Sequence, residues 1–230
     1  MEKIFAIGDI HGEFELLLKL MEKIEARREN DEGFIVVFLG DYVDRGPDSR
    51  SVVEFLMKGP SNPKDQWICL KGNHEDMMVE ALSAGGMDDW LHWRRNGGDA
   101  TQASYNGATR DEVSHDVSWM KDLPVMLEMD NHVFVHAGLM PGFDLDHQDE
   151  QTCMWIRDRF LRANGTDWNK HVVHGHTPHH GMKPKISEPE LLPWRTNLDT
   201  GAFHTQVLTA GLFDRNINSG PIEIIQAEGF

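Results

Sequence analysis

The chain has 230 residues, 40% of them hydrophobic, and its 38 acidic residues outnumber 22 Lys and Arg, giving a formal net charge of −16. This length and apolar content suit a single α/β domain over residues 1–230. The acidic balance argues against nucleic acid or an anionic membrane as a partner, because both are recognised through basic patches. No run approaches the roughly 20 apolar residues of a membrane span and no leader pattern precedes the first apolar run, so we expect a cytoplasmic protein.

The first half of the chain alternates apolar runs with helical patterns. Apolar runs of this length, each followed by a helix, are typical of buried parallel strands with crossover helices. We expect strands at 3–8, 34–39 and 66–71, helices at about 13–28 and 48–58, and a mostly helical stretch over about 75–120 with breaks at Gly85-Gly86 and Gly97-Gly98. The Met and Trp side chains of that stretch are interpreted as core filling.

The second half is richer in strands. We expect a β-hairpin formed by 124–129 and 132–138, a helix near 152–163, and strands at 171–174, 195–199, 205–212 and 221–226. Alternating helices and strands followed by a run of strands predict an α/β fold with mixed sheets and helices outside. Cys69 lies in an apolar run and Cys153 beside Trp155, so both are expected to be free, buried thiols.

Gly-rich motifs follow several of these strands. They are GDIHG at 8–12, GDYVDRG at 40–46, GNHE at 72–75, HAG at 136–138 and HGHT at 174–177. Gly at a strand end lets the backbone turn sharply, so the polar residue beside it projects from the carboxyl edge of the sheet, where open α/β sheets bind ligands. Asp9, Asp41 and Asn73 are spaced 32 residues apart, which suits one strand and one crossover helix per interval.

The residue types in these motifs point to metal chemistry. Carboxylate, imidazole and amide oxygen, without a thiolate, suit divalent ions such as Mn, Fe or Zn. A single Asp after a strand is usually a helix cap, and a single His near a core is usually a satisfied polar group. Five motifs in order favour instead a two-metal phosphoesterase site, in which Asp41 of the middle motif bridges the two ions.

These motifs, together with CMWIRDRF at 153–160 and LDTGA at 198–202, resemble those of the calcineurin-like metallophosphoesterases, specifically the bacterial and lambda-phage-type PPP serine/threonine protein phosphatases. The resemblance covers nearly the whole chain. It implies a central mixed β-sandwich flanked by helices in α/β/β/α layers. It also implies two divalent metal ions. We expect these ions to be Mn²⁺, with Fe or Zn as alternatives. By this resemblance, Asp9 and His11 hold the first ion, Asp41 bridges, and Asn73, His136 and His176 hold the second.

The resemblance also implies catalytic roles. His74 corresponds to a general acid, Asp44 to the carboxylate that orients it, and Arg45 and Arg157 to a guanidinium clamp on the phosphoryl oxygens. Asn73 is also expected to contact the phosphate. Lys71 immediately precedes GNHE, where many relatives carry Arg. It is expected to bind phosphate with its positive charge, but it cannot form the two parallel hydrogen bonds that an Arg side chain makes.

Other polar residues are expected outside these roles. His174 is interpreted either as a residue that contacts a metal ligand without binding the ion itself or as a purely structural residue. Arg159 is interpreted as a surface ion-pair residue. Surface or structural roles are expected for the residues that match no motif: Asn106, His115, His147, His171, His179 and His180.

The resulting expectation is hydrolysis of phosphoserine or phosphothreonine in proteins by direct attack of a metal-activated water, with a phosphorylated protein or peptide as partner. The alternatives are a symmetrical bis(5'-nucleosyl)-tetraphosphatase and, from another class, a non-catalytic metal-binding interaction protein. The sequence leaves open the natural substrate, the metal and the oligomeric state.

Overall fold

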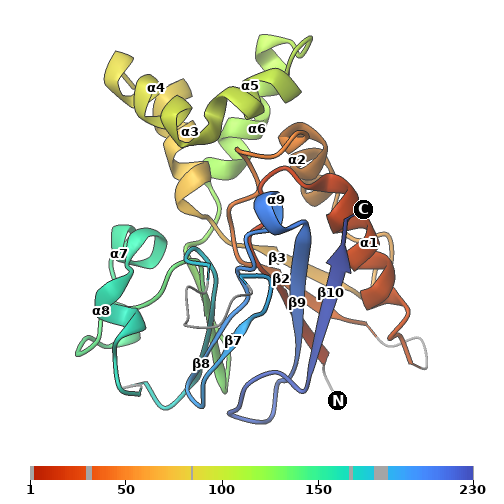
Figure 1. Cartoon of the computed structure of the whole chain (residues 1–230), viewed down its shortest axis with the longest axis vertical. Helices are drawn as coiled ribbons and strands as arrows, with labels where there is room; N and C mark the ends of the chain where they lie inside the picture. The colour runs from red at the N-terminus through yellow and green to blue at the C-terminus, as the bar shows by residue number, and fades with distance from the viewer. Residues whose placement is uncertain (1–2, 30–32, 84, 166–167, 179–185, 230) are drawn as a thin grey trace.

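The computed structural model describes residues 3–29, 33–83, 85–165, 168–178 and 186–229, and in these residues two five-stranded sheets lie face to face between helices (Figure 1). The first sheet has the order β10-β9-β1-β2-β3, with β1 (Lys3–Ile7), β2 (Ile35–Phe38), β3 (Gln66–Cys69), β9 (Val207–Asp214) and β10 (Glu223–Glu228). The second has the order β4-β5-β6-β8-β7, with β4 (Met126–Glu128), β5 (His132–Val135), β6 (His171–His174), β7 (Glu190–Leu191) and β8 (Arg195–Asn197).

Each sheet contains three neighbouring parallel strands, whose carboxyl ends meet at one edge. In the first sheet, Ile7 of β1 pairs with Phe38 of β2, which pairs with Cys69 of β3. In the second sheet, β5, β6 and β8 are parallel, while β4 and β7 pair antiparallel at the two edges. Each predicted Gly-rich motif therefore begins where a parallel strand ends.

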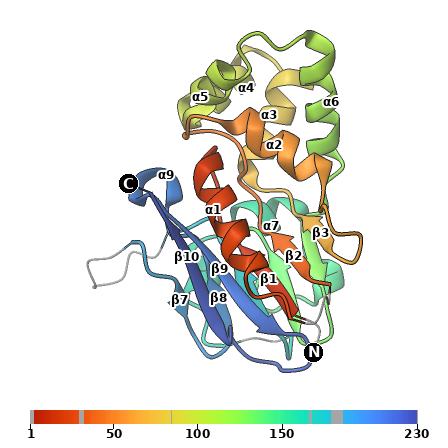
Figure 2. The ribbon, with the colours of Figure 1, turned by 90° about the vertical axis from the view of Figure 1, so that its right-hand side faces the viewer.

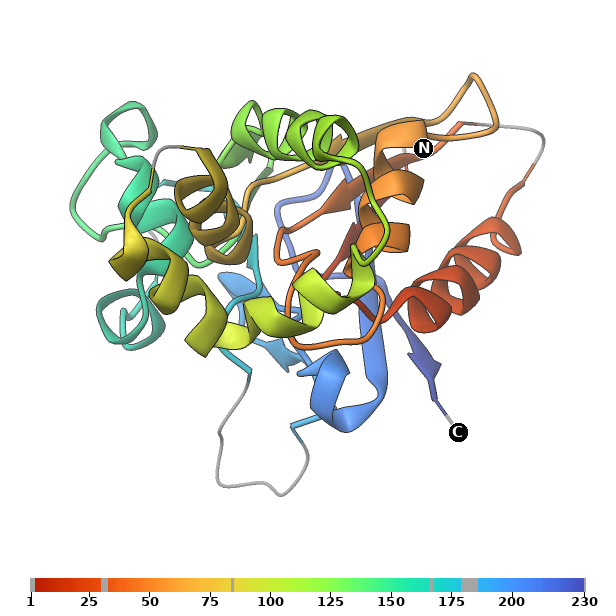
Figure 3. The same ribbon diagram turned by 90° about the horizontal axis from the view of Figure 1, so that it is seen from above.

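The helices cover the outer faces and one end of the sandwich (Figure 2). Beside the first sheet lie α1 (Phe14–Glu25) and α2 (Ser49–Lys58), and beside the second lie α7 (Glu150–Trp155) and α8 (Asp158–Leu161). The helices that cross the end of the sandwich are α3 (Asn73–Ser83), α4 (Met87–Trp93), the π-helical turn η1 (Arg94–Gly98), α5 (Asp99–Ser104) and α6 (Arg110–Lys121) (Figure 3). Two short turns, η2 (Leu145–His147) and α9 (Ala202–Thr205), complete the helical segments.

Three hydrophobic clusters fill the spaces between the layers. Between helices and the first sheet, residues such as Leu17 and Val53 pack on Phe5 and Phe38. Between the sheets, strand residues pack against one another: Ile4, Ala6, Val37, Leu39, Phe134, Val173 and Phe213. The third cluster joins Val133 and Val172 to Cys153 and Phe160 of the outer helices. This order of helix, sheet, sheet and helix confirms the predicted α/β/β/α arrangement.

The structure corrects several local predictions. The helix expected near 152–163 is two short helices, because the backbone of Arg157 leaves the helical region at φ −128° and ψ −100°. The strand expected from 205 begins at Val207, after the turn α9. The thiol of Cys153 is free and buried as expected, whereas Cys69 is only half-buried. Within the described residues, no helix is long and apolar enough to cross a membrane.

Candidate active site

The ends of the parallel strands bring the predicted ligands together. Residues from both sheets meet here, and each is at most 5% exposed: Asp9, His11, Asp41, Asn73, His74, His136 and His176. Five of the seven non-Gly residues with positive φ among the described residues lie in this region: His11, Asp41, Asp44, Arg45 and His176. Such conformations cost about 1–3 kcal/mol each and cluster at functional sites, where the surrounding structure holds them.

One side of the cluster is formed by His11 and Asp41. The His11 Nδ1 lies 2.9 Å from the Val43 carbonyl oxygen, to which it donates its proton. The lone pair is then on Nε2, which lies 3.4 Å from Asp41 Oδ2. Two electron-pair donors face each other here, as expected where a cation would lie between them.

The other side is formed by His136, Asn73 and His176. The His136 Nδ1 donates to the Leu39 carbonyl oxygen at 2.9 Å, so Nε2 carries the lone pair. That Nε2 lies 3.0 Å from Asn73 Oδ1, 3.2 Å from His176 Nδ1 and 3.3 Å from Asp41 Oδ1. The His176 Nε2 is buried and has no hydrogen-bond partner among the residues that the structure describes. These donors fit a divalent ion, with Asp41 common to both sides.

Charge distribution supports the same arrangement. Burial alone would raise the pKa of the Asp41 carboxyl, but His136, His74 and His11, in their protonated forms, lower that pKa below its usual range. Burial lowers the pKa of His11, His136 and His176, so these imidazoles are neutral near pH 7. Neutral imidazole and ionised carboxylate are the forms that bind metals.

Asp9 lies beside this cluster and is paired with Asp199, a residue to which the sequence assigned no role. Both Asp9 oxygens lie 3.1 Å from the backbone nitrogen of His176. Burial, then repulsion from Asp199 and Asp41, raises the pKa of Asp9, and burial raises that of Asp199 to about 6. A hydrogen bond to Asp9 partly offsets the rise in the pKa of Asp199. Among the described residues, two sets of side chains have their ligand atoms close enough together to hold a metal ion. One is His11, Asp41 and His74, and the other is Asp41, His136 and His176.

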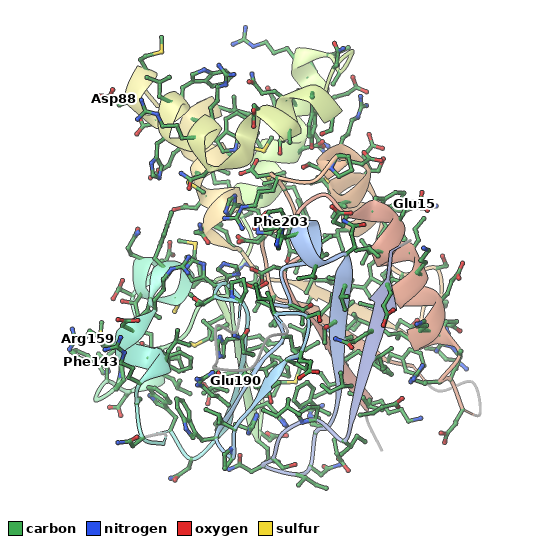
Figure 4. The ribbon with its side chains drawn as sticks, in the orientation of Figure 1. Glu15, Asp88, Phe143, Arg159, Glu190 and Phe203 are labelled. Atoms are coloured by element: carbon green, nitrogen blue, oxygen red, sulfur yellow. The ribbon has the colours of Figure 1, made fainter. Side chains whose placement is uncertain are left out.

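His74 is held on one side of its ring by Asp44. Its Nδ1 lies 2.7 Å from Asp44 Oδ2, and its Nε2 lies 2.9 Å from Arg45 Nη2. The other guanidinium nitrogen of Arg45 lies 2.9 Å from His11 Nε2. Arg45 therefore joins the predicted general acid to the metal-ligand cluster. Phe203 lies on α9 (Figure 4). The centre of its ring is 5.0 Å from the Arg45 guanidinium carbon.

The remaining predicted site residues have different surroundings. Arg157 is exposed and donates from Nη1 to Thr177 Oγ1 at 3.2 Å, and its charge contributes to the lowered pKa of His176. The Lys71 ammonium donates to the Lys121 carbonyl at 2.7 Å, which caps the end of α6. Its predicted contact with phosphate stays a prediction. Arg159 is exposed on α8.

Among the described residues, the histidines outside the cluster are either buried or exposed at the surface. His174 Nε2 accepts from Arg195 Nη1 at 3.1 Å, and burial followed by that positive charge lowers the pKa of His174 to about 3. His171 is buried in β6, whereas His115 and His147 are exposed, as is Asn106. His179 and His180 lie outside the described residues.

Glu75 is a further residue that the sequence left without a role. Its carboxylate accepts from the backbone N–H groups of Asp41, Tyr42 and Gly72 at 2.7–2.9 Å. It thereby ties the GDYVDRG and GNHE loops together. Its position in the GNHE motif was the available signal, but only the fold shows that it faces the neighbouring loop.

The chain matches known proteins in sequence. The family model of the calcineurin-like phosphoesterases matches residues 2–204. Serine/threonine-protein phosphatase 2 of Escherichia coli K12 is 35% identical over 189 residues, which cover 75% of this chain and 78% of that protein. A symmetrical bis(5'-nucleosyl)-tetraphosphatase of Methylobacillus flagellatus is 31% identical over 173 residues, covering 74% of this chain and 54% of that protein.

Fold comparison gives the same result over the full length. A crystal structure of a candidate diadenosine tetraphosphatase superposes with a TM-score of 0.67 at 21% identity, covering 100% of this chain and 94% of the other. This likeness concerns the fold. Together, the matched family model, the relatives and the ligand cluster show that the chain belongs to the calcineurin-like metallophosphoesterases, in the bacterial branch of the PPP family.

Proposed function

We propose that this metallophosphoesterase is a cytoplasmic phosphomonoesterase that hydrolyses phosphoserine and phosphothreonine in proteins. The observation that carries the proposal is the position of Arg45, whose guanidinium lies between His11 of the ligand cluster and His74. A cation that can bind phosphate thus stands between a metal site and a candidate proton donor. The partner is a phosphorylated protein or peptide.

The cluster supplies ligands for two divalent ions, proposed to be Mn²⁺. His11, Asp41 and the neighbouring Asp9 would hold one, and Asp41, Asn73, His136 and His176 the other. When bound, the ions supply Lewis acidity that lowers the pKa of an attacking water. The carbonyls of Val43 and Leu39 keep His11 and His136 in the tautomer that presents Nε2 to an ion.

Arg45 and Arg157 bind the phosphoryl oxygens in this proposal. Both side chains belong to exposed residues at the rim of a buried ligand cluster, so a phosphate monoester can reach them from solvent. A guanidinium matches two phosphate oxygens at once and stabilises charge on the group in transfer.

His74 protonates the leaving alkoxide through Nε2, while Asp44 accepts from Nδ1 and holds the ring. Serine alkoxide is a poor leaving group, so this proton matters more for phosphoserine than for an activated ester. Arg45 occupies Nε2 at 2.9 Å in this structure. When Arg45 turns to phosphate, His11 Nε2 would be free for an ion, and His74 Nε2 would be free to take up the proton that it then gives to the leaving oxygen.

A symmetrical dinucleoside tetraphosphatase is the second candidate, favoured by the tetraphosphatase relative at 31% identity and by the exposed Phe203 ring, on which a nucleobase could stack. The test loads metal-free protein with Mn²⁺ and compares turnover on a phosphoserine peptide, a phosphotyrosine peptide and diadenosine tetraphosphate. Highest kcat/KM on phosphoserine supports the proposal. Dominant turnover of the dinucleotide overturns it in favour of the second candidate, and no turnover of any substrate favours a non-catalytic metal-binding protein.

A further inference from the structure

The segment 93–101, WRRNGGDAT, connects α4 to α5 and lies against the GDYVDRG loop that carries Asp44 and Arg45. It begins with Trp93, whose indole Nε1 donates to Asp44 Oδ1 at 2.9 Å and lies 3.1 Å from Oδ2. Trp93 is 1% exposed and Asp44 is fully buried, so solvent does not compete for this hydrogen bond. A side chain expected to be core filling thus has a polar contact with the catalytic loop.

Thr101, at the other end of the segment, contacts the same residue twice. Its Oγ1 accepts from the Asp44 backbone nitrogen at 2.8 Å and donates to Asp44 Oδ1 at 2.7 Å. It also lies 3.0 Å from Ser49 Oγ. One hydroxyl therefore holds both the backbone and the carboxylate of Asp44, a residue with φ +72°.

The two glycines of the segment allow this close approach. A Cβ on Gly98 would lie 2.6 Å from the Trp93 ring, and one on Gly97 would lie 2.8 Å from Arg45 Cγ. Gly97 has φ +108°, and its carbonyl oxygen accepts from the Arg45 backbone nitrogen at 3.2 Å. The break predicted at these glycines is therefore also a contact surface for the loop.

The two oxygens of the Asp44 carboxylate accept hydrogen bonds from different parts of the structure. Oδ1 accepts from Trp93 and Thr101, and Oδ2 accepts from His74 Nδ1 at 2.7 Å. With Oδ1 held by two donors, the plane of the carboxylate is set, and with it the direction in which His74 Nε2 points. A hydrogen bond between a neutral group and a carboxylate is stronger than one between neutral groups, so these contacts can hold the geometry.

Trp93 is held by hydrogen bonds as well as by core packing. Part of its surface lines a cavity of about 160 Å³ that Trp90, Tyr105 and Thr101 also line. The hydrogen bonds to Asp44 add a directional restraint that this packing does not supply.

We infer that Trp93 and Thr101 are positioning residues for proton donation by His74, so that the segment 93–101 is part of the catalytic apparatus. The inference rests on the general-acid role of His74 in the proposed function. Neither residue touches substrate in this account, because both act through Asp44.

The test uses Trp93→Phe and Thr101→Val, which remove the donors and keep most of the side-chain volume. Each should lower kcat on a phosphoserine peptide about 10-fold, the effect of losing one hydrogen bond to a charged group. The kcat on p-nitrophenyl phosphate should change less than about 2-fold, since that leaving group needs little protonation. KM and bound Mn²⁺ should stay near wild type.

Trp90→Phe is the matched control. Trp90 lines the same cavity and contacts Trp93 with ring centroids 5.5 Å apart, so the substitution tests packing without an Asp44 contact. It should leave both kcat values unchanged. In a His74→Asn background, Trp93→Phe should cause no further loss on phosphoserine peptide, because the group that it positions is gone.

The results separate this inference from the proposed function. If His74→Asn shows the leaving-group difference and Trp93→Phe and Thr101→Val do not, the positioning role is wrong. Equal losses on both substrates, or a further loss in the His74→Asn background, would assign Trp93 a structural role. If His74→Asn itself shows no leaving-group difference, the general-acid part of the proposed function fails first.

Discussion

At the scale of single residues, His74 gives the most direct mechanistic prediction. Its Nδ1 is hydrogen-bonded to Asp44, which leaves Nε2 as the atom that can donate a proton to a leaving group. His74→Asn should lower kcat on a phosphoserine peptide by about 10²–10⁴-fold, the usual contribution of a general acid. The loss on p-nitrophenyl phosphate should be much smaller, and metal analysis should find nearly unchanged Mn²⁺. Equal losses on the two substrates would contradict the role.

Asp199 is the site residue that the sequence could not reveal. LDTGA has the composition of a turn, and nothing local indicates that its Asp meets Asp9 from the other end of the chain. The contact depends on β8 joining the second sheet beside β6 and on a close approach at Gly8, where a Cβ would lie 2.2 Å from the Leu198 carbonyl oxygen. By contrast, the close approach of the polar residues in the Gly-rich motifs could be predicted, because each motif follows a buried strand.

At the scale of elements, prediction succeeded where both faces of a strand are buried. The run KIFAI predicted β1, and the run HVVH, with two valines at its centre, predicted β6. Apolar runs of this kind are typical of interior strands. The antiparallel pairing of β9 with β1 has no such signal, because Lys3 pairs with Asp214 across nearly the whole chain. The two-residue β7 is too short to carry a pattern.

The strand-to-helix turns permit a test of element packing. A Cβ on Gly72, between β3 and α3, would lie 2.2 Å from Asp41 Oδ1 and 2.4 Å from Asp41 N. Gly72→Ala should therefore displace the proposed bridging carboxylate, lower the free energy of unfolding by roughly 2–4 kcal/mol and weaken Mn²⁺ binding. Denaturant unfolding and metal titration measure the two effects. Gly86→Ala is the control, since its added Cβ would have no atom of the described residues beyond its chain neighbours within 4 Å. Equal behaviour of both variants would contradict the packing argument.

At the scale of the whole molecule, the proposed metal site joins the two sheets. His11 and Asp41 follow strands of the first sheet, whereas His136 and His176 follow strands of the second. Bound ions should therefore stabilise the fold: Mn²⁺ at 100 times its Kd adds about 2.7 kcal/mol. Calorimetry should show a Tm that falls on chelation and recovers with Mn²⁺. Asp41→Asn should abolish most of that recovery, and a Tm that ignores Mn²⁺ in the wild type would count against the site.

Acid should destabilise the second sheet through its buried histidines. Burial, then the neighbouring His132, lowers the pKa of His171 to about 4, below the usual value of 6.5. Between these values the unfolded chain binds a proton that the folded chain excludes, so the stabilisation is complete above pH 6.5 and is lost as the pH falls toward 4. A shift of this size corresponds to about 3 kcal/mol.

His171→Gln should therefore flatten the pH dependence of unfolding between pH 6.5 and 4, while keeping a polar group near Thr196 Oγ1, which His171 Nε2 contacts at 2.9 Å. Denaturant unfolding of the metal-free protein measures this without a contribution from ion release. His147→Gln makes the same substitution at an exposed position and should leave the profile unchanged. If His171→Gln keeps the wild-type slope, the acid sensitivity arises elsewhere, and His174, whose pKa is lowered to about 3, becomes the next residue to substitute.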